Sequence, residues 1–225
     1  MYLSLSPTLI GTDTWIAISG GANHSLGLRT DGRLFSWGDN FQGQLGDGTT
    51  TNRLTPTLIG SDTWIAISGG GLHSLGLRTD GRLFSWGDNS VGQLGDGTTT
   101  DRRTPTLIGP DTWIAISGGE SHSLGLRSDG RLFAWGRNFN GQLGDGTTSD
   151  RHTPTLIGPD TWIAISGGVR HSLGLRSDGR LFAWGDNEVG RLGDGTVTDR
   201  HMPTLIGPDT WIAISGGGHH SLGLR

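Results

Sequence analysis

Residues 14–38 read TWIAISGGANHSLGLRTDGRLFSWG, and this stretch decides the fold. It contains three short runs in which apolar residues alternate with polar or small ones, at 15–19, 24–29 and 33–37. Alternation with a period of two is typical of β-strands, and the Gly-Gly and Asp-Gly pairs between the runs are turn dipeptides. The stretch therefore predicts three antiparallel strands joined by short turns.

The same stretch recurs along the chain at a fixed period. Its first tryptophan, Trp15, is repeated every 49 residues as far as Trp211, so the 225-residue chain is a tandem array. A fourth run, at 56–59, follows a long polar connection, and Pro56 suits an outer strand that lacks one ladder donor. We name the four strands of each unit A (15–19), B (24–29), C (33–37) and D (56–59).

Each unit has the pattern of a propeller blade. Four short strands in 49 residues, apolar on both faces, suit a sheet that packs between two like sheets, and no stretch has helical periodicity. We therefore expect an all-β fold, a β-propeller of four-stranded blades in one domain spanning 1–225. The expected units are 14–62, 63–111, 112–160 and 161–209, with a partial unit at 210–225 and an outer strand at 5–10.

The strand count leaves two arrangements open. Strands A, B and D occur five times each, whereas strand C occurs only four times, which makes about 4.5 to 5 blades. One arrangement is a partial array from a longer repeat protein, and the other is a small ring closed by the N-terminal strand D. Arg225 ends a strand B where the next hairpin is expected, and the resulting unpaired edge favours the partial array. Open end blades would also allow self-association of the chain.

Composition and charge exclude several classes of function. The formal net charge is −4 and Arg alternates with Asp in every unit, so we expect no nucleic-acid partner. The absence of cysteine excludes thiolate metal sites and thiol nucleophiles. We see no signal peptide and no apolar run of membrane-spanning length, so we expect no membrane anchor. The localisation is left open, with the cytoplasm weakly favoured.

Three repeated motifs resemble catalytic or metal sites, and each has a structural interpretation. A ring nitrogen of each repeat histidine can satisfy a backbone group beside the glycine pair, which we favour over a metal ring. His24 and Ser25 are adjacent on a strand and therefore point to opposite faces, which excludes a nucleophile and base pair within one unit. Asp47-Gly48 is first of all a turn dipeptide, which we favour over a calcium loop. We expect no catalytic residue, no metal site and no cofactor, and hence no enzyme. The repeat histidines are His24, His73, His122, His171 and His220.

The segment GGANHSLGLRTDGRLFSWGDNFQGQLGDGTT, residues 20–50, closely resembles the repeat of the regulator of chromosome condensation family. The resemblance rests on Gly-Gly-x-x-His-Ser, the Asp-Gly hairpin, Trp-Gly-x-Asn and Gly-Gln-Leu-Gly, and it covers nearly the whole chain. It implies a propeller, usually of seven blades. It also implies a role such as exchange factor for a small GTPase, light sensor, enzyme inhibitor or interaction module.

A comparison of the units with one another indicates where a partner binds. The units differ mainly at the pair before each histidine and at the start of the C–D connection. Because antiparallel strands reverse direction at each step, the A–B and C–D connections should emerge at the same end of every blade. We therefore predict a scaffold for protein–protein interaction that binds through this end; the alternative is a guanine-nucleotide exchange factor or another regulator of a small GTPase. The predicted partner-binding residues are Phe41, Gln42, Ser90, Val91, Glu120, Phe139, Asn140, Arg170, Glu188 and Val189.

Overall fold

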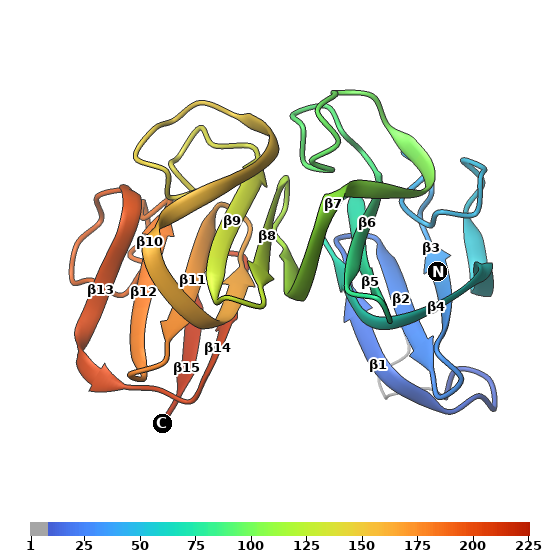
Figure 1. Cartoon of the computed structure of the whole chain (residues 1–225), viewed down its shortest axis with the longest axis horizontal. Helices are drawn as coiled ribbons and strands as arrows, with labels where there is room; N and C mark the ends of the chain where they lie inside the picture. The colour runs from blue at the N-terminus through green and yellow to red at the C-terminus, as the bar shows by residue number, and fades with distance from the viewer. Residues whose placement is uncertain (1–8) are drawn as a thin grey trace.

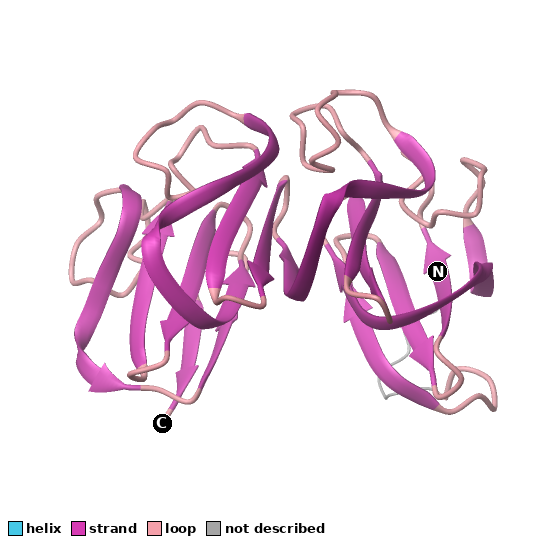
Figure 2. Cartoon of the chain, in the orientation of Figure 1, coloured by secondary structure: helices cyan, strands magenta, loops and turns pink. Residues whose placement is uncertain are grey.

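The computed structural model describes residues 9–225, and this part of the chain is built from strands and loops without a helix (Figures 1 and 2). The prediction of an all-β fold is therefore confirmed. No helix of these residues could cross a membrane. The strands are β1 (Trp15–Gly20), β2 (His24–Arg29), β3 (Arg33–Gly38), β4 (Arg53–Gly69), β5 (His73–Arg78), β6 (Arg82–Gly87), β7 (Arg102–Gly118), β8 (His122–Arg127), β9 (Arg131–Gly136), β10 (Arg151–Gly167), β11 (His171–Arg176), β12 (Arg180–Gly185), β13 (Arg200–Thr210), β14 (Ala213–Gly216) and β15 (Ser221–Leu224).

The strands form repeated groups of four, which we call blades. In the first blade β1 pairs with β2, β2 with β3, and β3 with the first half of β4, all antiparallel. The strands β1 to β13 follow one another in chain order, and β14 pairs only with β15. Within residues 9–225 the sheet does not close, and the first and last strand groups lie at opposite ends of the array (Figure 1).

The connection from strand D to the next strand A differs from the prediction. Separate strands were expected at 56–59 and 64–68, but β4 runs unbroken for 17 residues. Its first half pairs with β3 and its second half with β5, and the register shifts between Leu58 and Thr63. Gly60 lies at this bend with a φ of 61°, a conformation that glycine adopts without strain, so the chain changes blade while remaining extended.

The N-terminal outer strand expected at 5–10 falls mainly outside the described residues. Leu9 and Ile10 are described, and they form no strand.

The core lies between neighbouring blades, as the repeated tryptophans predict. Trp64 meets the edge of the Phe84 ring at a centroid distance of 5.5 Å and lies 5.9 Å from Trp86. Each such aromatic residue buries roughly 150–250 Å² on folding, so every blade contributes a large apolar surface to its neighbour. These rings pack against residues of the preceding blade, namely Leu26, Leu28, Leu34 and Ile59.

Candidate functional site

The repeat histidines bond to serines of the following blade. His24 Nε2 lies 2.8 Å from Ser74 Oγ, and Ser74 Oγ donates its single hydrogen to the Gln44 carbonyl at 2.8 Å. The imidazole must therefore be the donor to the serine oxygen, through a protonated Nε2. The expected backbone partner was wrong; the partner is the serine of the next unit. The same contact recurs as His73–Ser123 at 2.9 Å, His122–Ser172 at 2.9 Å and His171–Ser221 at 3.0 Å.

Burial keeps these histidines neutral. Burial, with a smaller contribution from the neighbouring His24 and His122, lowers the pKa of His73 to about 3. Burial also lowers the pKa of His24 to about 4, against an opposing effect of Asp39. A histidine that donates to a serine whose own hydrogen is already engaged cannot accept the hydroxyl proton. These His–Ser pairs therefore join blades and do not form activated nucleophiles.

The Gly-Gln-Leu-Gly segment of each of the first three blades docks on the next blade. The Gln44 carbonyl accepts hydrogen bonds from Ser74 Oγ and, at 3.0 Å, from Trp86 Nε1. Gly46 lies flat on the same indole, where a Cβ would approach Trp86 Nε1 to 2.7 Å. Only glycine fits there, which explains its place in the motif.

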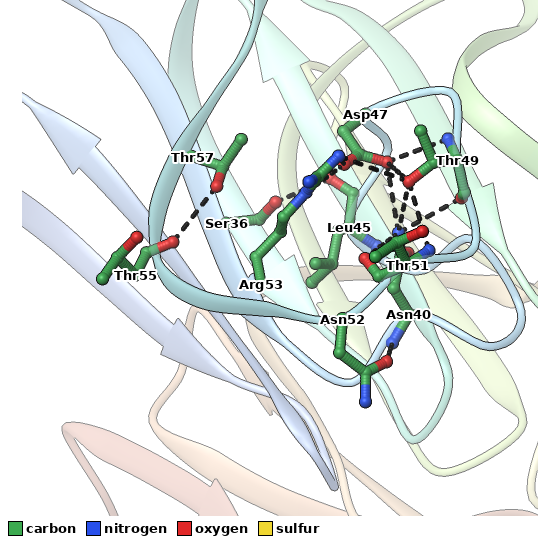
Figure 3. Close-up of polar contacts among 10 residues, drawn as sticks. All are labelled: Ser36, Asn40, Leu45, Asp47, Thr49, Thr51, Asn52, Arg53, Thr55 and Thr57. Atoms are coloured by element: carbon green, nitrogen blue, oxygen red, sulfur yellow. Dashed lines mark hydrogen bonds and ion pairs between the residues drawn. The ribbon is translucent and has the colours of Figure 1, made fainter.

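One asparagine holds the long C–D connection of each blade in shape (Figure 3). Asn40 is fully buried; its Nδ2 donates to Asp47 Oδ1 at 3.1 Å and to the carbonyls of Thr49 and Thr51, each at 3.1 Å. Its Oδ1 accepts from the Leu45 amide at 3.0 Å. The connection is therefore a fixed loop that can present its remaining side chains in defined positions.

Asp47 is part of the same network. Burial raises its pKa, but hydrogen bonds from Thr49, Arg53 and Asn40 outweigh burial and hold the pKa below its usual value. Arg53 Nε donates to Asp47 Oδ2 at 2.7 Å, so both carboxylate oxygens are engaged within the loop. The interpretation of Asp-Gly as a structural turn agrees with this geometry. Within residues 9–225 no cluster of three or more His, Asp or Glu side chains is placed to hold a metal ion.

The A–B and C–D connections lie at the same end of each blade. The amide of Asp39, which begins the C–D connection, donates to the carbonyl of Asn23 in the A–B connection at 2.8 Å. At the other end, the Trp64 amide donates to the carbonyl of Gly32 in the Asp-Gly hairpin, also at 2.8 Å. We call the first end the loop face; the C–D connections of the second and third blades, between β6 and β7 and between β9 and β10, lie at the upper edge of Figure 1.

The predicted partner-binding residues differ in exposure. Phe41 and Phe139 are 73% and 72% exposed, and Val189 is 60% exposed. Gln42, Val91 and Asn140 are half-buried, and their amides donate to a glutamine side chain two residues further on. The remaining exposed members are Ser90, Glu120, Arg170 and Glu188.

A depression of about 370 Å³ on the loop face brings two of these residues together with two that sequence reasoning missed. Glu120 and Arg170 line it, with the Arg170 Nε 4.0 Å from Glu120 Oε2. Arg137 and Asp88 line it as well. Both occupy the position after a Trp-Gly pair, and the charge reversal at that position in the third unit is the sequence signal that could have identified Arg137.

The strand groups, the histidines between blades and the docked glycine-rich loops define a protein built from propeller-type repeats. The chain belongs to the RCC1-like domain family, whose family model matches residues 3–223. The resemblance noted in the sequence is thereby confirmed. No curated protein sequence matches the chain.

Several solved structures share this fold. Human WBSCR16 is 26% identical with a TM-score of 0.87, over 95% of this chain and 58% of that protein. Yeast RCC1 (Prp20), in a crystal structure bound to Kap60, is 26% identical with a TM-score of 0.86, over 97% of this chain and 56% of that protein. A second structure, of Saccharomyces cerevisiae Prp20p, gives the same identity and TM-score over 57% of its length. The chain therefore spans a little over half the length of these relatives.

Proposed function

We propose that this chain is a protein-binding scaffold that engages its partner through the loop face. The observation that carries the proposal is the pairing of a fixed frame with variable, exposed side chains. Asn40 and its counterparts hold each C–D connection rigidly, whereas the residue that follows each asparagine changes from unit to unit. Recognition residues commonly lie on loops that a rigid scaffold positions.

The two exposed phenylalanines are the best anchors on this face. Phe41 and Phe139 directly follow the buried asparagines Asn40 and Asn138, so their backbones are fixed before any partner arrives. Large aromatic side chains that lose little freedom on binding contribute much of the affinity at protein interfaces. A partner that covers either ring would remove a large apolar surface from water.

Relatives of this chain are known with protein partners. Yeast RCC1 (Prp20) is seen bound to Kap60, and the Prp20p structure is described together with its binding to Gsp1p and histones. Protein binding by a fold of this family supports the scaffold proposal.

A second candidate is regulation of a small GTPase as an exchange factor, which the family resemblance favours. The two functions separate in one measurement. A scaffold that binds a GTPase leaves the rate of nucleotide release unchanged, whereas an exchange factor accelerates it.

The scaffold proposal is tested by mapping the partner-binding end. Partners captured on the immobilised chain would be compared between wild type and the double variant F41A/F139A, with melting curves to verify folding. The matched control reverses the exposed Asp-Gly hairpin charges at the opposite end, with Asp→Lys at Asp31, Asp80, Asp129 and Asp178. Loss of binding only in the phenylalanine variant supports the loop face. Loss only in the hairpin variant would show that the partner uses the other end.

A further inference from the structure

The residue after each Trp-Gly pair has a structural partner in the first two blades. Asp39 Oδ2 accepts from Gln44 Nε2 at 2.9 Å, and Asp88 Oδ2 accepts from Gln93 Nε2 at 2.7 Å. Hydrogen bonds to a charged group are among the stronger side-chain contacts in proteins. The repeat therefore shows which residue the fold itself favours at this position: an aspartate.

The fourth blade changes this pair and compensates for the change. Arg191 takes the place of the glutamine, and its NH1 lies 3.2 Å from Asp186 Oδ2, with both side chains at most 3% exposed. Arg191 NH1 also donates to the Gly218 carbonyl at 3.4 Å. The new charge is therefore paired and has a structural explanation.

In the third blade the aspartate of the Asp–Gln pair is replaced, and no other residue within 9–225 takes over its hydrogen bond. Arg137 stands where the other blades have aspartate, and Gln142 Oε1 still accepts from the Asn140 amide at 3.0 Å. Within residues 9–225 the Asn140 amide is the only hydrogen-bond partner of the Gln142 side chain, and Arg137, which is exposed, forms no ion pair. A residue that gives up a local stabilising contact without an internal gain is expected at a functional position.

The surroundings of Arg137 indicate the kind of ligand. The depression of about 370 Å³ that it lines also contains Arg170, with Asn23 and Ser121 as further polar residues. Asp88 lies there too, but Gln93 and Ser90 already donate to its carboxylate. Glu120 is 4.0 Å from Arg170, with both side chains about half exposed. The Arg137 guanidinium is therefore the least satisfied charge in the depression.

We propose that Arg137, with Arg170 in the same depression, binds a carboxylate side chain in an acidic segment of a partner protein. This inference rests on the proposed function, since it assigns a partner chemistry to the loop face. A planar guanidinium matches a carboxylate through two parallel hydrogen bonds. A nucleic-acid backbone fits less well, because Asp88 and Glu120 line the same depression and the chain carries a net charge of −4.

The test uses a fluorescent hexaglutamate peptide and measures binding by fluorescence anisotropy. Wild type should bind the peptide, and R137D should weaken binding at least tenfold. R137D restores the residue of the other three blades and gives Gln142 Nε2 an acceptor, so its melting temperature should be equal to or above that of wild type. The matched control is R131D, which makes the same charge change in the same blade at the exposed start of β9. R137K should be intermediate, because it keeps the charge and loses the paired hydrogen bonds.

Three results would overturn the inference. The first is that wild type does not bind hexaglutamate, and the second is that R131D weakens binding as much as R137D. The third is that a phosphoserine peptide or a single-stranded oligonucleotide binds more tightly than hexaglutamate and depends on Arg137. The scaffold proposal can be judged separately, because the F41A/F139A variant tests it with captured partners. If R137D leaves hexaglutamate binding intact while F41A/F139A loses partners, only the carboxylate site fails.

Discussion

Replacement of His122 by alanine tests how the blades are held together. His122 is fully buried between the third and fourth blades, and its Nε2 lies 2.9 Å from Ser172 Oγ. We expect H122A to lower the free energy of unfolding by about 1–3 kcal/mol. The chain offers its own control in His220, the exposed repeat histidine of the partial unit, for which H220A should change stability by less than about 0.5 kcal/mol.

The expected loss of unfolding free energy in H122A has two parts. The hydrogen bond to Ser172 contributes about 1 kcal/mol, and Ser172 keeps its own bond to the Gln142 carbonyl at 2.7 Å. The rest comes from the space left by the ring, which packs directly on Gly119. A double-mutant cycle with S172A isolates the first part, because the coupling energy should be about 1 kcal/mol.

Urea unfolding followed by tryptophan fluorescence measures these differences, since the tryptophans lie in the interfaces between blades. The prediction is contradicted if H122A and H220A lower the free energy of unfolding by the same amount. It is also refuted if the cycle with S172A shows no coupling, which would mean that the His–Ser contact contributes nothing to stability.

Three further predictions concern stability in acid, the buried asparagine of a C–D connection, and the effect of metal ions on stability. Lowering the pH from 7 to 5 should reduce the free energy of unfolding by about 2 kcal/mol per buried histidine. In this range a histidine of the unfolded chain, with a pKa near 6.5, takes up a proton. The folded His73 and His122, each with a pKa of about 3, stay neutral. This loss continues as the pH falls towards the folded pKa, and equal urea midpoints at pH 7 and pH 5 would contradict it. N89A, which removes the buried centre of the second C–D connection, should cost about 2–3 kcal/mol in urea unfolding, whereas N23A at an exposed position should cost little. Zinc or a chelator should leave the melting curve unchanged, because Nε2 of four repeat histidines already donates to a serine, and a large shift with either would revive the metal interpretation.

Local sequence patterns predict the strands well because each strand is coded by its own alternation. The runs at 15–19, 24–29 and 33–37 become β1, β2 and β3 within one residue of their expected bounds. The continuous β4 was not predictable in this way. Gly60 and the polar residues after it have the composition of a turn, and only pairing with strands of two different blades keeps the chain extended through them.

The contacts between blades could not be predicted from the sequence of a single unit. His24 and Ser25 on the same strand cannot meet, and this inference was correct. The actual partner, Ser74, lies 50 residues further along and is brought close only by the stacking of blades. Likewise, the sequence marks Gly-Gln-Leu-Gly as a motif, but its function depends on Trp86 and Ser74 of the next blade.

A near-identical array separates the residues that the fold needs from those that it tolerates. The histidine, the serine, the asparagine and the docked glycines recur because each completes a contact within or between blades. The residue after the asparagine completes no side-chain contact that is common to the four blades, and it varies as Phe41, Ser90, Phe139 and Glu188. Arg191 and Arg137 then show why variation alone is insufficient evidence of function. Both depart from the repeat, but Arg191 is buried against Asp186, whereas Arg137 is left exposed at the cost of an Asp–Gln hydrogen bond. Stability accounts for the first change, and the carboxylate binding that we propose for Arg137 would account for the second.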